Sequence, residues 1–220
     1  MTLQRQDTGT TKTESGFLVQ AGGSVTGEFL LTGNTNCAGI GSAQGQINGS
    51  NVAISVDQVG QTVNLTGALG TNSSITGNYS ILASPCGSNQ IGTWTATQVQ
   101  PFSGKFQGAF TSTFTSGLSF GFSGSVSQGI NTGSSTASLT GSMTSSNAPC
   151  FSMATLTGSI SGTSIVLNLL SSEGVALGQI HGTTTTKGTT TDAVYDFTNS
   201  QSSPSNGCQD FGTVVLTLTR

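Results

Sequence analysis

Charged side chains are scarce in this chain of 220 residues. Only five are Lys or Arg and eight are Asp or Glu, so the net charge at pH 7 is −3. Five basic residues are too few to follow a phosphate backbone, and we therefore expect no nucleic-acid partner. The sequence has no run of about 18 apolar residues, so no transmembrane helix is predicted. Its first residues also lack the apolar core of a signal peptide.

Residues that commonly carry catalysis or bind metals are also few. The single histidine, His181, is predicted on an exposed strand face, and no nucleophile motif of the G-x-S-x-G type is present. Asp192 and Asp196 lie four residues apart, which is too far on one strand for a retaining glycosidase pair. Together with Asp210 they could bind Ca²⁺, but the spacing matches no calcium-binding loop. We predict a protein that is not an enzyme and has no cofactor or metal.

Small and hydroxyl-bearing residues are abundant instead. Gly, Ser and Thr make up nearly half of the chain, while 33% of the residues are hydrophobic. A disordered chain usually carries many charges and few regularly placed apolar residues. Here the apolar residues alternate with polar ones, as in Val52-Ala53-Ile54-Ser55-Val56. This pattern predicts half-buried β-strands with a hydroxyl-covered outer face.

A cysteine-framed pattern occurs twice in the sequence. Cys37 and Cys150 are 150 − 37 = 113 residues apart, and the same separation relates Gly49 to Gly162. Repeats of this kind indicate duplicated architecture. We predict a first β repeat over residues 16–100 and a second over residues 101–220. Residues 1–15 are polar and aperiodic, and they are predicted to form a flexible leader.

The four cysteines favour disulfide bonds over a metal site, because no C-x-x-C spacing occurs. Equivalent repeats should close equivalent loops, which predicts the pairs Cys37–Cys86 and Cys150–Cys208 over the other two connectivities. Structural disulfides imply an oxidising compartment. We therefore expect an extracellular or bacterial cell-envelope location, with the signal or lipid-anchor segment absent from this chain. The alternative is a cytosolic protein with four buried thiols.

The turn signals divide the sequence into about fourteen short strands without a convincing helix. Asn48-Gly49 between two alternating segments is typical of a tight hairpin. Short connections favour an antiparallel up-and-down meander, and glycines on the apolar faces favour a barrel-like, all-β fold. The sequence leaves open whether the repeats form two small barrels or one large one. The Phe-rich segment from Phe102 to Phe122 is predicted to form core or the seam between copies.

Two short motifs carry a resemblance to known families. Ile75-Thr76-Gly77-Asn78-Tyr79 and Gly92-Thr93-Trp94 resemble elements of avidin-like and lipocalin-like barrels. Those families hold small ligands in the mouths of antiparallel barrels. The second copy has Gly212-Thr213-Val214 without the Trp. The residues with which avidin contacts its ligand cannot be placed on this sequence. Over its whole length, the chain resembles Gly/Ser/Thr-rich bacterial envelope lipoproteins in general character, without a diagnostic motif.

Three functions follow as expectations. The first is a non-enzymatic extracellular or cell-envelope module with a binding or structural role, whose hydroxyl-rich surface suits polysaccharide. The second is a carrier of a small apolar ligand, with Tyr79, Trp94 and Tyr195 lining its pocket; the alternative is that these aromatics belong to the core. The third is an adhesive or ice-binding surface of Thr rows, for which the sequence offers Thr93-Thr95-Thr97, Thr111-Thr113-Thr115 and Thr217-Thr219.

Overall fold

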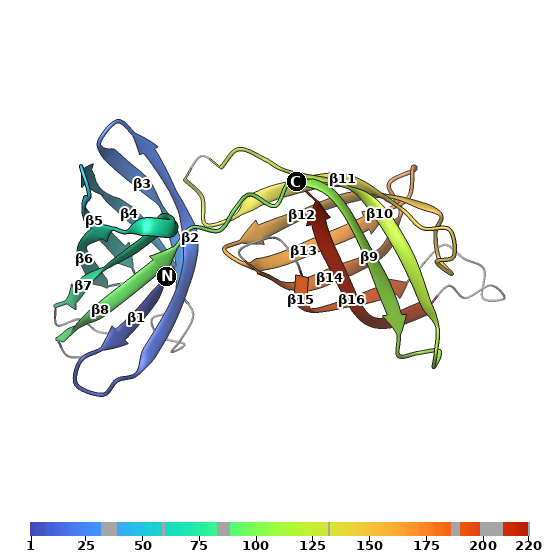
Figure 1. Cartoon of the computed structure of the whole chain (residues 1–220), viewed down its shortest axis with the longest axis horizontal. Coiled ribbons are helices and arrows are strands. Elements are labelled where there is room, and N and C mark those ends of the chain that lie inside the picture. Colours follow the sequence, from blue (N-terminus) through green and yellow to red (C-terminus); the bar gives the residue numbers. More distant parts are fainter. Residues whose placement is uncertain are drawn as a thin grey trace. The chain divides into compact units, whose positions relative to one another are not determined.

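The chain folds into two closed β-barrels of eight strands each (Figure 1). The computed structural model describes residues 1–31, 39–58, 60–82, 89–131, 133–185, 190–198 and 209–219. Within them lie sixteen strands and one turn of 3-10 helix, η1 (Thr71–Ser73). Each strand pairs antiparallel with its neighbours in sequence, and the first strand of each barrel pairs with its last. The all-β, up-and-down, duplicated fold is thus confirmed, and two small barrels form rather than one large one.

The first barrel contains β1 (Thr2–Arg5), β2 (Thr11–Ala21), β3 (Ser24–Leu31), β4 (Gly39–Asn48), β5 (Asn51–Gln58), β6 (Gln61–Leu69), β7 (Ser74–Ile81) and β8 (Gln90–Thr97). It closes where Thr2 of β1 pairs with Thr95 of β8. Alternate side chains of each strand point inward, and the enclosed core includes Val56, Leu65 and Trp94. The barrel therefore has a packed interior.

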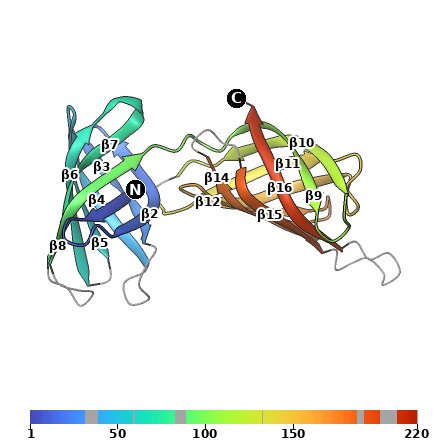
Figure 2. The same ribbon diagram turned by 60° about the horizontal axis from the view of Figure 1, so that its bottom comes forward.

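The second barrel contains β9 (Gly104–Ser112), β10 (Ser119–Gln128), β11 (Ala137–Thr144), β12 (Met153–Ser161), β13 (Ser164–Leu170), β14 (Ala176–Thr184), β15 (Thr190–Thr198) and β16 (Gln209–Thr219). Figure 2 shows β16 beside β9, where the barrel closes. Five phenylalanines of the Phe-rich segment are buried in this unit, whereas Phe114 is 56% exposed; the buried ones are Phe102, Phe106, Phe110, Phe120 and Phe122. Phe110 lies at the centre of the core, with ring centroids 4.3 Å from Phe122, 4.8 Å from Tyr195 and 5.0 Å from Phe197.

Residues 1–15 are not a flexible leader. They contain β1 and the beginning of β2, and β1 supplies the closing strand of the first barrel. Only two side chains of the segment, Leu3 and Glu14, are fully buried. Because one of these is a carboxylate, the usual alternation of apolar and polar residues is missing. This is why the sequence pattern did not reveal the two strands.

The boundary between the two units lies close to its predicted position. One compact unit contains Met1–Gln98 together with the short segment Asn131–Thr136, and the other contains Val99–Ile130 and Ala137–Arg220. The short segment was predicted as part of the second repeat. Within the first unit, the Ser135 N–H donates a hydrogen bond of 2.9 Å to a carboxylate oxygen of Glu28. A connection between two strands of one barrel thus contributes to the other unit.

The duplicated sequence pattern occupies equivalent places in the two barrels. Asn48-Gly49 turns β4 into β5, and Ser161-Gly162 turns β12 into β13, so each turn joins the fourth and fifth strands of its barrel. The φ angles of Gly49 and Gly162 are +59° and +57°. Both lie in the left-handed region, which glycine enters without steric cost. The repeat therefore reflects the same hairpin built twice.

Glycines inside the strands make room for aromatic side chains on the neighbouring strand. Tyr79 pairs with Gly92, and a methyl group on Gly92 would lie 2.6 Å from the Tyr79 ring. Phe197 pairs with Gly178, where the same substitution would bring a methyl group within 2.7 Å of the ring. Such pairs let strongly curved strands keep a filled interior. The inward glycines of the sequence thus mark close packing, as predicted for a barrel.

Candidate functional site

The three aromatic residues predicted to line a pocket belong to the two barrel cores. Tyr79 and Trp94 lie in the first barrel and Tyr195 in the second, each with no more than 4% of its surface exposed. The Trp94 indole N–H donates a 2.9 Å hydrogen bond to the carbonyl of Thr66, two strands away. Gly77 is the pairing partner of Trp94, and a Cβ there would meet the Thr66 carbonyl oxygen that accepts this bond. The polar edge of this ring is therefore already used within the barrel.

Tyr195 takes part in a buried polar cluster at one end of the second barrel. Its hydroxyl donates a 2.8 Å hydrogen bond to Oδ2 of Asp210, and Ser112 donates one of 2.5 Å to Oδ1. The Thr115 N–H in turn donates to the Ser112 hydroxyl. Burial and the bond to Asp210 raise the pKa of Tyr195 well above its ordinary value. The cluster joins β9, β15 and β16 and satisfies a carboxylate in the core.

Of the other acidic residues singled out in the sequence, Asp196 does not join this cluster. Asp196 is exposed on the outer face of β15, whereas Asp210 is only 2% exposed and points inward. The backbone of Asp192 lies in β15, and its side chain is outside the described part of the structure. Among the described residues, no group of three His, Cys, Asp or Glu side chains is placed to hold a metal ion. His181 is exposed on β14, as predicted.

The predicted disulfides fall largely outside the described residues. Cys37, Cys86 and Cys208 are not described, while Cys150 is half-buried and the described part of the chain holds no free cysteine. In sequence, Cys37 follows β3 and Cys86 follows β7, two strands that run in the same direction around the barrel. Cys150 and Cys208 follow β11 and β15 in the same way. The pairing within each copy stays a prediction, and the strand order is consistent with it.

An outer face of the first barrel carries four exposed amide side chains, and we call it the amide wall. Its residues form two rows across neighbouring strands, fixed by the pairing register. One row contains Thr66, Asn78, Thr93 and Gln4; the other contains Asn64, Ser80, Ile91 and Gln6. Two adjoining hollows of about 320 and 370 Å³ lie over it and share Gln6, Asn78 and Gly92. The wall spans β6, β7, β8 and β1.

The amide groups of this wall are available to a ligand. Within the described part of the chain, no hydrogen bond engages the side-chain amides of Gln4, Gln6, Asn64 or Asn78. Each amide presents two donors and an acceptor. Beside the wall, the Arg5 guanidinium donates 2.8 and 2.5 Å hydrogen bonds to Asp7 and holds the pKa of that carboxyl below its ordinary value. The two charges offset each other, so the wall as a whole is close to neutral.

A row of threonines continues the wall on one side. Thr76, Thr95, Thr2 and Thr13 occupy paired positions on β7, β8, β1 and β2. Thr95 belongs to the sequence pattern Thr93-Thr95-Thr97, whose members alternate along β8 on its exposed face. The sequence thus predicted exposed threonines along a strand. Their alignment across four strands follows only from the register of the barrel.

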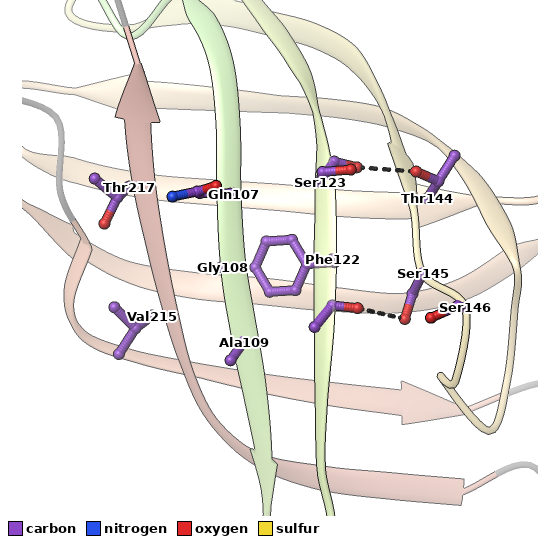
Figure 3. A pocket seen from close by; sticks show the side chains of 11 residues that line it. Gln107, Gly108, Ala109, Phe122, Ser123, Thr144, Ser145, Ser146, Val215 and Thr217 are labelled. Carbon is purple, nitrogen blue, oxygen red and sulfur yellow. Dashed lines mark hydrogen bonds between the residues drawn. The ribbon is translucent and has the colours of Figure 1, made fainter.

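A larger hollow of about 760 Å³ lies on the outer face of the second barrel (Figure 3). Its upper row contains Thr217, Gln107, Ser123 and Thr144, one from each of four neighbouring strands. Val215, Ala109 and Gly121 form the row below. Val215 is 57% exposed. Gly121 has no side chain and Ala109 has a short one, so the surface is depressed at these two positions. We call this surface the β10 hollow, because β10 crosses its floor.

Sequence reasoning missed both surfaces. Gln4 and Gln6 lay in the segment predicted as a leader, Asn64 was assigned no role, and Asn78 was named only within the motif that resembles avidin-like barrels. A signal was present in the spacing, since Gln4/Gln6, Asn64/Thr66 and Asn78/Ser80 are each two apart and share a strand face. Bringing these pairs together needed the order and register of the strands.

Comparison with known proteins gives no relative from which a function could be transferred. No protein-family model, curated protein or solved structure matches the chain. No helix in the described residues is long and apolar enough to cross a membrane. The site must therefore be judged on its own chemistry.

Proposed function

We propose that this chain is a non-enzymatic extracellular or cell-envelope module that binds neutral polysaccharide through the outer wall of its first barrel. The observation that carries the proposal is the set of four exposed amides with no partner among the described residues. A sugar hydroxyl both donates and accepts, and an amide offers both functions side by side. The nearly neutral wall suits an uncharged ligand better than an ionic one.

The geometry of the wall suits an extended polymer. Its two rows each cross four strands, and neighbouring strands lie about 4.8 Å apart. A chain of sugar rings lying along a row would meet one polar side chain at each strand. Ile91, which is 59% exposed in the second row, offers the apolar face of a sugar ring a contact. The flanking threonine row adds hydroxyls to the same surface.

The alternative of a small-molecule carrier receives less support. Tyr79, Trp94 and Tyr195 pack into the barrel cores, and the indole N–H of Trp94 and the hydroxyl of Tyr195 bond to other groups of the protein. A carrier of the lipocalin kind needs such side chains to face an open cavity. The hollows described above instead lie on outer faces. A native mass spectrum of protein purified from its own host, with a ligand mass that leaves on denaturation, would favour the carrier.

A second candidate is the adhesive or ice-binding surface, and the row Thr76, Thr95, Thr2 and Thr13 favours it specifically. An ice-binding face must be flat over several rows, whereas the wall of an eight-stranded barrel is curved and twisted. We therefore place this candidate second. Thermal hysteresis of the purified protein decides it: hysteresis lost on changing Thr95→Lys would establish the ice-binding role.

Binding to neutral polysaccharide is tested by affinity electrophoresis. The chain is run in native gels with soluble neutral polysaccharides of several linkages, and we expect retardation by at least one of them. The double variant Asn64→Ala/Asn78→Ala should weaken binding about thirtyfold, because it removes two net hydrogen bonds of about 1 kcal/mol each. Retardation should persist at about 0.5 M salt, since screening acts on charges and not on hydroxyl contacts.

The control is the double variant Gln44→Ala/Gln46→Ala. It removes two exposed amides from β4 on the same barrel but outside the wall, and it should leave binding unchanged. Equal retardation of the two double variants would refute the amide wall as the site. Retardation only by charged polysaccharides, lost when salt is added, would refute the choice of a neutral ligand.

A further inference from the structure

The floor of the β10 hollow is a place where the β-ladder of the second barrel is incomplete. β10 pairs with β9 from Ser119 to Val126, but it pairs with β11 only from Ser123 onward. β11 ends at Thr144, and the next residue, Ser145, bonds through its N–H to Ser152 on the side of β12. The stretch from Ser119 to Phe122 therefore has a strand on one side only.

The direction of the backbone groups on this stretch follows from the ladder. In an antiparallel pair, the N–H and C=O of one residue point to the same side and alternate along the strand. The Leu118 carbonyl accepts a hydrogen bond from Ser112 of β9, so even-numbered residues of β10 point toward β9. Ser119 and Gly121 therefore direct their backbone groups to the opposite side, where β11 has ended.

Two hydroxyl groups partly replace the missing strand (Figure 3). Ser145 donates a 2.8 Å hydrogen bond to the Gly121 carbonyl, and Thr144 donates one of 3.3 Å to the Ser123 carbonyl. In both bonds the acceptor is a backbone carbonyl, so neither bond provides a partner for a backbone N–H of β10. They leave the Gly121 N–H directed into the hollow, and both backbone groups of Ser119 directed to the same side of β10, without a backbone partner in the described chain.

Apart from the buried Ser145 hydroxyl on the Gly121 carbonyl, which an added strand would have to displace, the side chains around this edge leave it accessible. Natural edge strands are usually protected by Lys, by Pro or by a bulge. Here the exposed positions are Ser119, Gly121 and Ser123, none of which is bulky or charged. A Cβ on Gly121 would have no atom nearer than 3.8 Å, so the space above it is open. The hollow contains no charged residue among those that line it.

We propose that the β10 edge binds an extended peptide segment of a partner protein, which adds to the second barrel as a short strand beside Ser119–Phe122. Backbone donors and acceptors repeating at every second residue are matched by another extended backbone. The uncharged hollow favours a segment with small, neutral side chains. This inference concerns the second barrel alone and does not depend on the polysaccharide proposal for the first.

The test is an NMR titration of the ¹⁵N-labelled full chain with a strand-forming peptide. The probe is acetyl-Lys-Ser-Val-Thr-Val-Ser-Lys-amide, with terminal lysines for solubility. We expect saturable shifts of the Ser119, Gly121 and Ser123 amides. The same peptide N-methylated at successive residues cannot pair through either edge, and it should cause none of these shifts.

A pair of variants at one position separates edge pairing from other contacts. Gly121→Ala keeps the N–H and has room for its methyl group, so it should bind like the parent. Gly121→Pro removes the N–H and places ring atoms on the open edge, while the ladder to β9 does not use that N–H. Binding should fall at least tenfold. The N-methylated peptide gives the same comparison if Gly121→Pro fails to fold.

Three results of the peptide experiments would overturn the inference. They are an absence of shifts at millimolar peptide, equal shifts with the N-methylated peptide, and equal binding by Gly121→Ala and a folded Gly121→Pro. Shifts of the same three amides with a neutral oligosaccharide, but not with the peptide, would also overturn it and assign the hollow to the sugar ligand.

Discussion

Glu14 is the most unusual residue of the first barrel, because a carboxyl group occupies an inward position of a strand. Its side chain is 1% exposed, and neither carboxyl oxygen has a hydrogen-bond partner in the described chain. Burial raises its pKa to about 7, although the Met1 ammonium group and Lys12 act in the opposite direction. The neutral acid is therefore the form that the folded barrel accommodates best.

The stability of the first barrel should fall as pH rises from about 4.5 to above 7. The folded state holds the Glu14 proton more tightly than the unfolded state, so the stabilisation present below pH 4.5 is lost through this window. The full effect is up to about 3 kcal/mol. Glu14→Gln should remove it. The measurement is the opening free energy of β5 amides by hydrogen exchange at pH 5 and pH 8, corrected for intrinsic rates. An equal pH dependence in the variant would contradict the assignment.

At the scale of single residues, the sequence predicts the regular positions and misses the exceptions. The alternation in Val52, Ile54 and Val56 correctly identifies three buried side chains. The same rule fails at Glu14, because an inward carboxylate looks like a surface residue. Asn64 and Asn78 lie on the outside of the barrel, and no local sequence pattern states that they share a wall with Gln4.

At the scale of elements, β1 is the weakest part of the first barrel. It has only four residues and is held by three residue pairs to β2 and four to β8. Leu3 is its only fully buried side chain, at 3% exposure. The closure of the barrel therefore depends on one inward leucine and two short ladders.

Replacing Leu3→Ala should destabilise the first barrel by about 2–4 kcal/mol, through lost burial and the cavity left behind. Amide exchange should accelerate in β1 and β8 more than in β5, because the closing strand detaches first. The neighbouring outward substitution Gln4→Ala should change stability by less than about 0.5 kcal/mol. Uniform acceleration over all strands of the barrel would show instead that β1 does not open separately.

Fourteen strands were predicted, and they correspond to β3 through β16 in the structure. Most of them contain apolar residues at alternate positions, bounded by Gly, Asn or Ser turns. The two missed strands, β1 and β2, adjoin the segment Asp7–Thr10, whose polar residues conceal a hairpin. Local pattern was therefore sufficient wherever a strand buried several apolar residues, and it failed where burial relied on one leucine and one acid.

At the scale of the whole molecule, the two barrels offer separate loops for the predicted disulfides. The bonds Cys37–Cys86 and Cys150–Cys208 would close loops of 86 − 37 = 49 and 208 − 150 = 58 residues. Loops of this length give about 4 kcal/mol of stabilisation each in the chain-entropy model. Each bond would constrain its own barrel.

The oxidised chain should be four hydrogens lighter than the reduced chain, and non-reducing peptide mapping should recover both pairs. Cys150→Ser/Cys208→Ser should lower the stability of the second barrel by up to about 4 kcal/mol. The β13 amides should report this loss in hydrogen exchange, while the β5 amides of the first barrel serve as the internal control. Peptides that link Cys37 or Cys86 to the second copy would contradict the pairing.

The choice between one large barrel and two small ones was beyond the sequence. Both arrangements use the same strands and the same alternation, and they differ only in which strands pair at the ends of each copy. The decision rests on the pairing of Thr2 with Thr95 and of Lys105 with Thr219. Such contacts join residues that are far apart in the sequence, so no local sequence pattern reveals them.

These closing pairs have a consequence for how the chain can evolve. Because each barrel is closed, its first and last strands are neighbours, and because the number of strands is even, these two strands are antiparallel. The polypeptide therefore enters and leaves a copy at the same end of the barrel. A copy can therefore be appended, lost or transplanted by recombination without opening any other copy. The ancestral event behind the duplicated cysteine frame needed only a short joint such as Gln98-Val99-Gln100-Pro101.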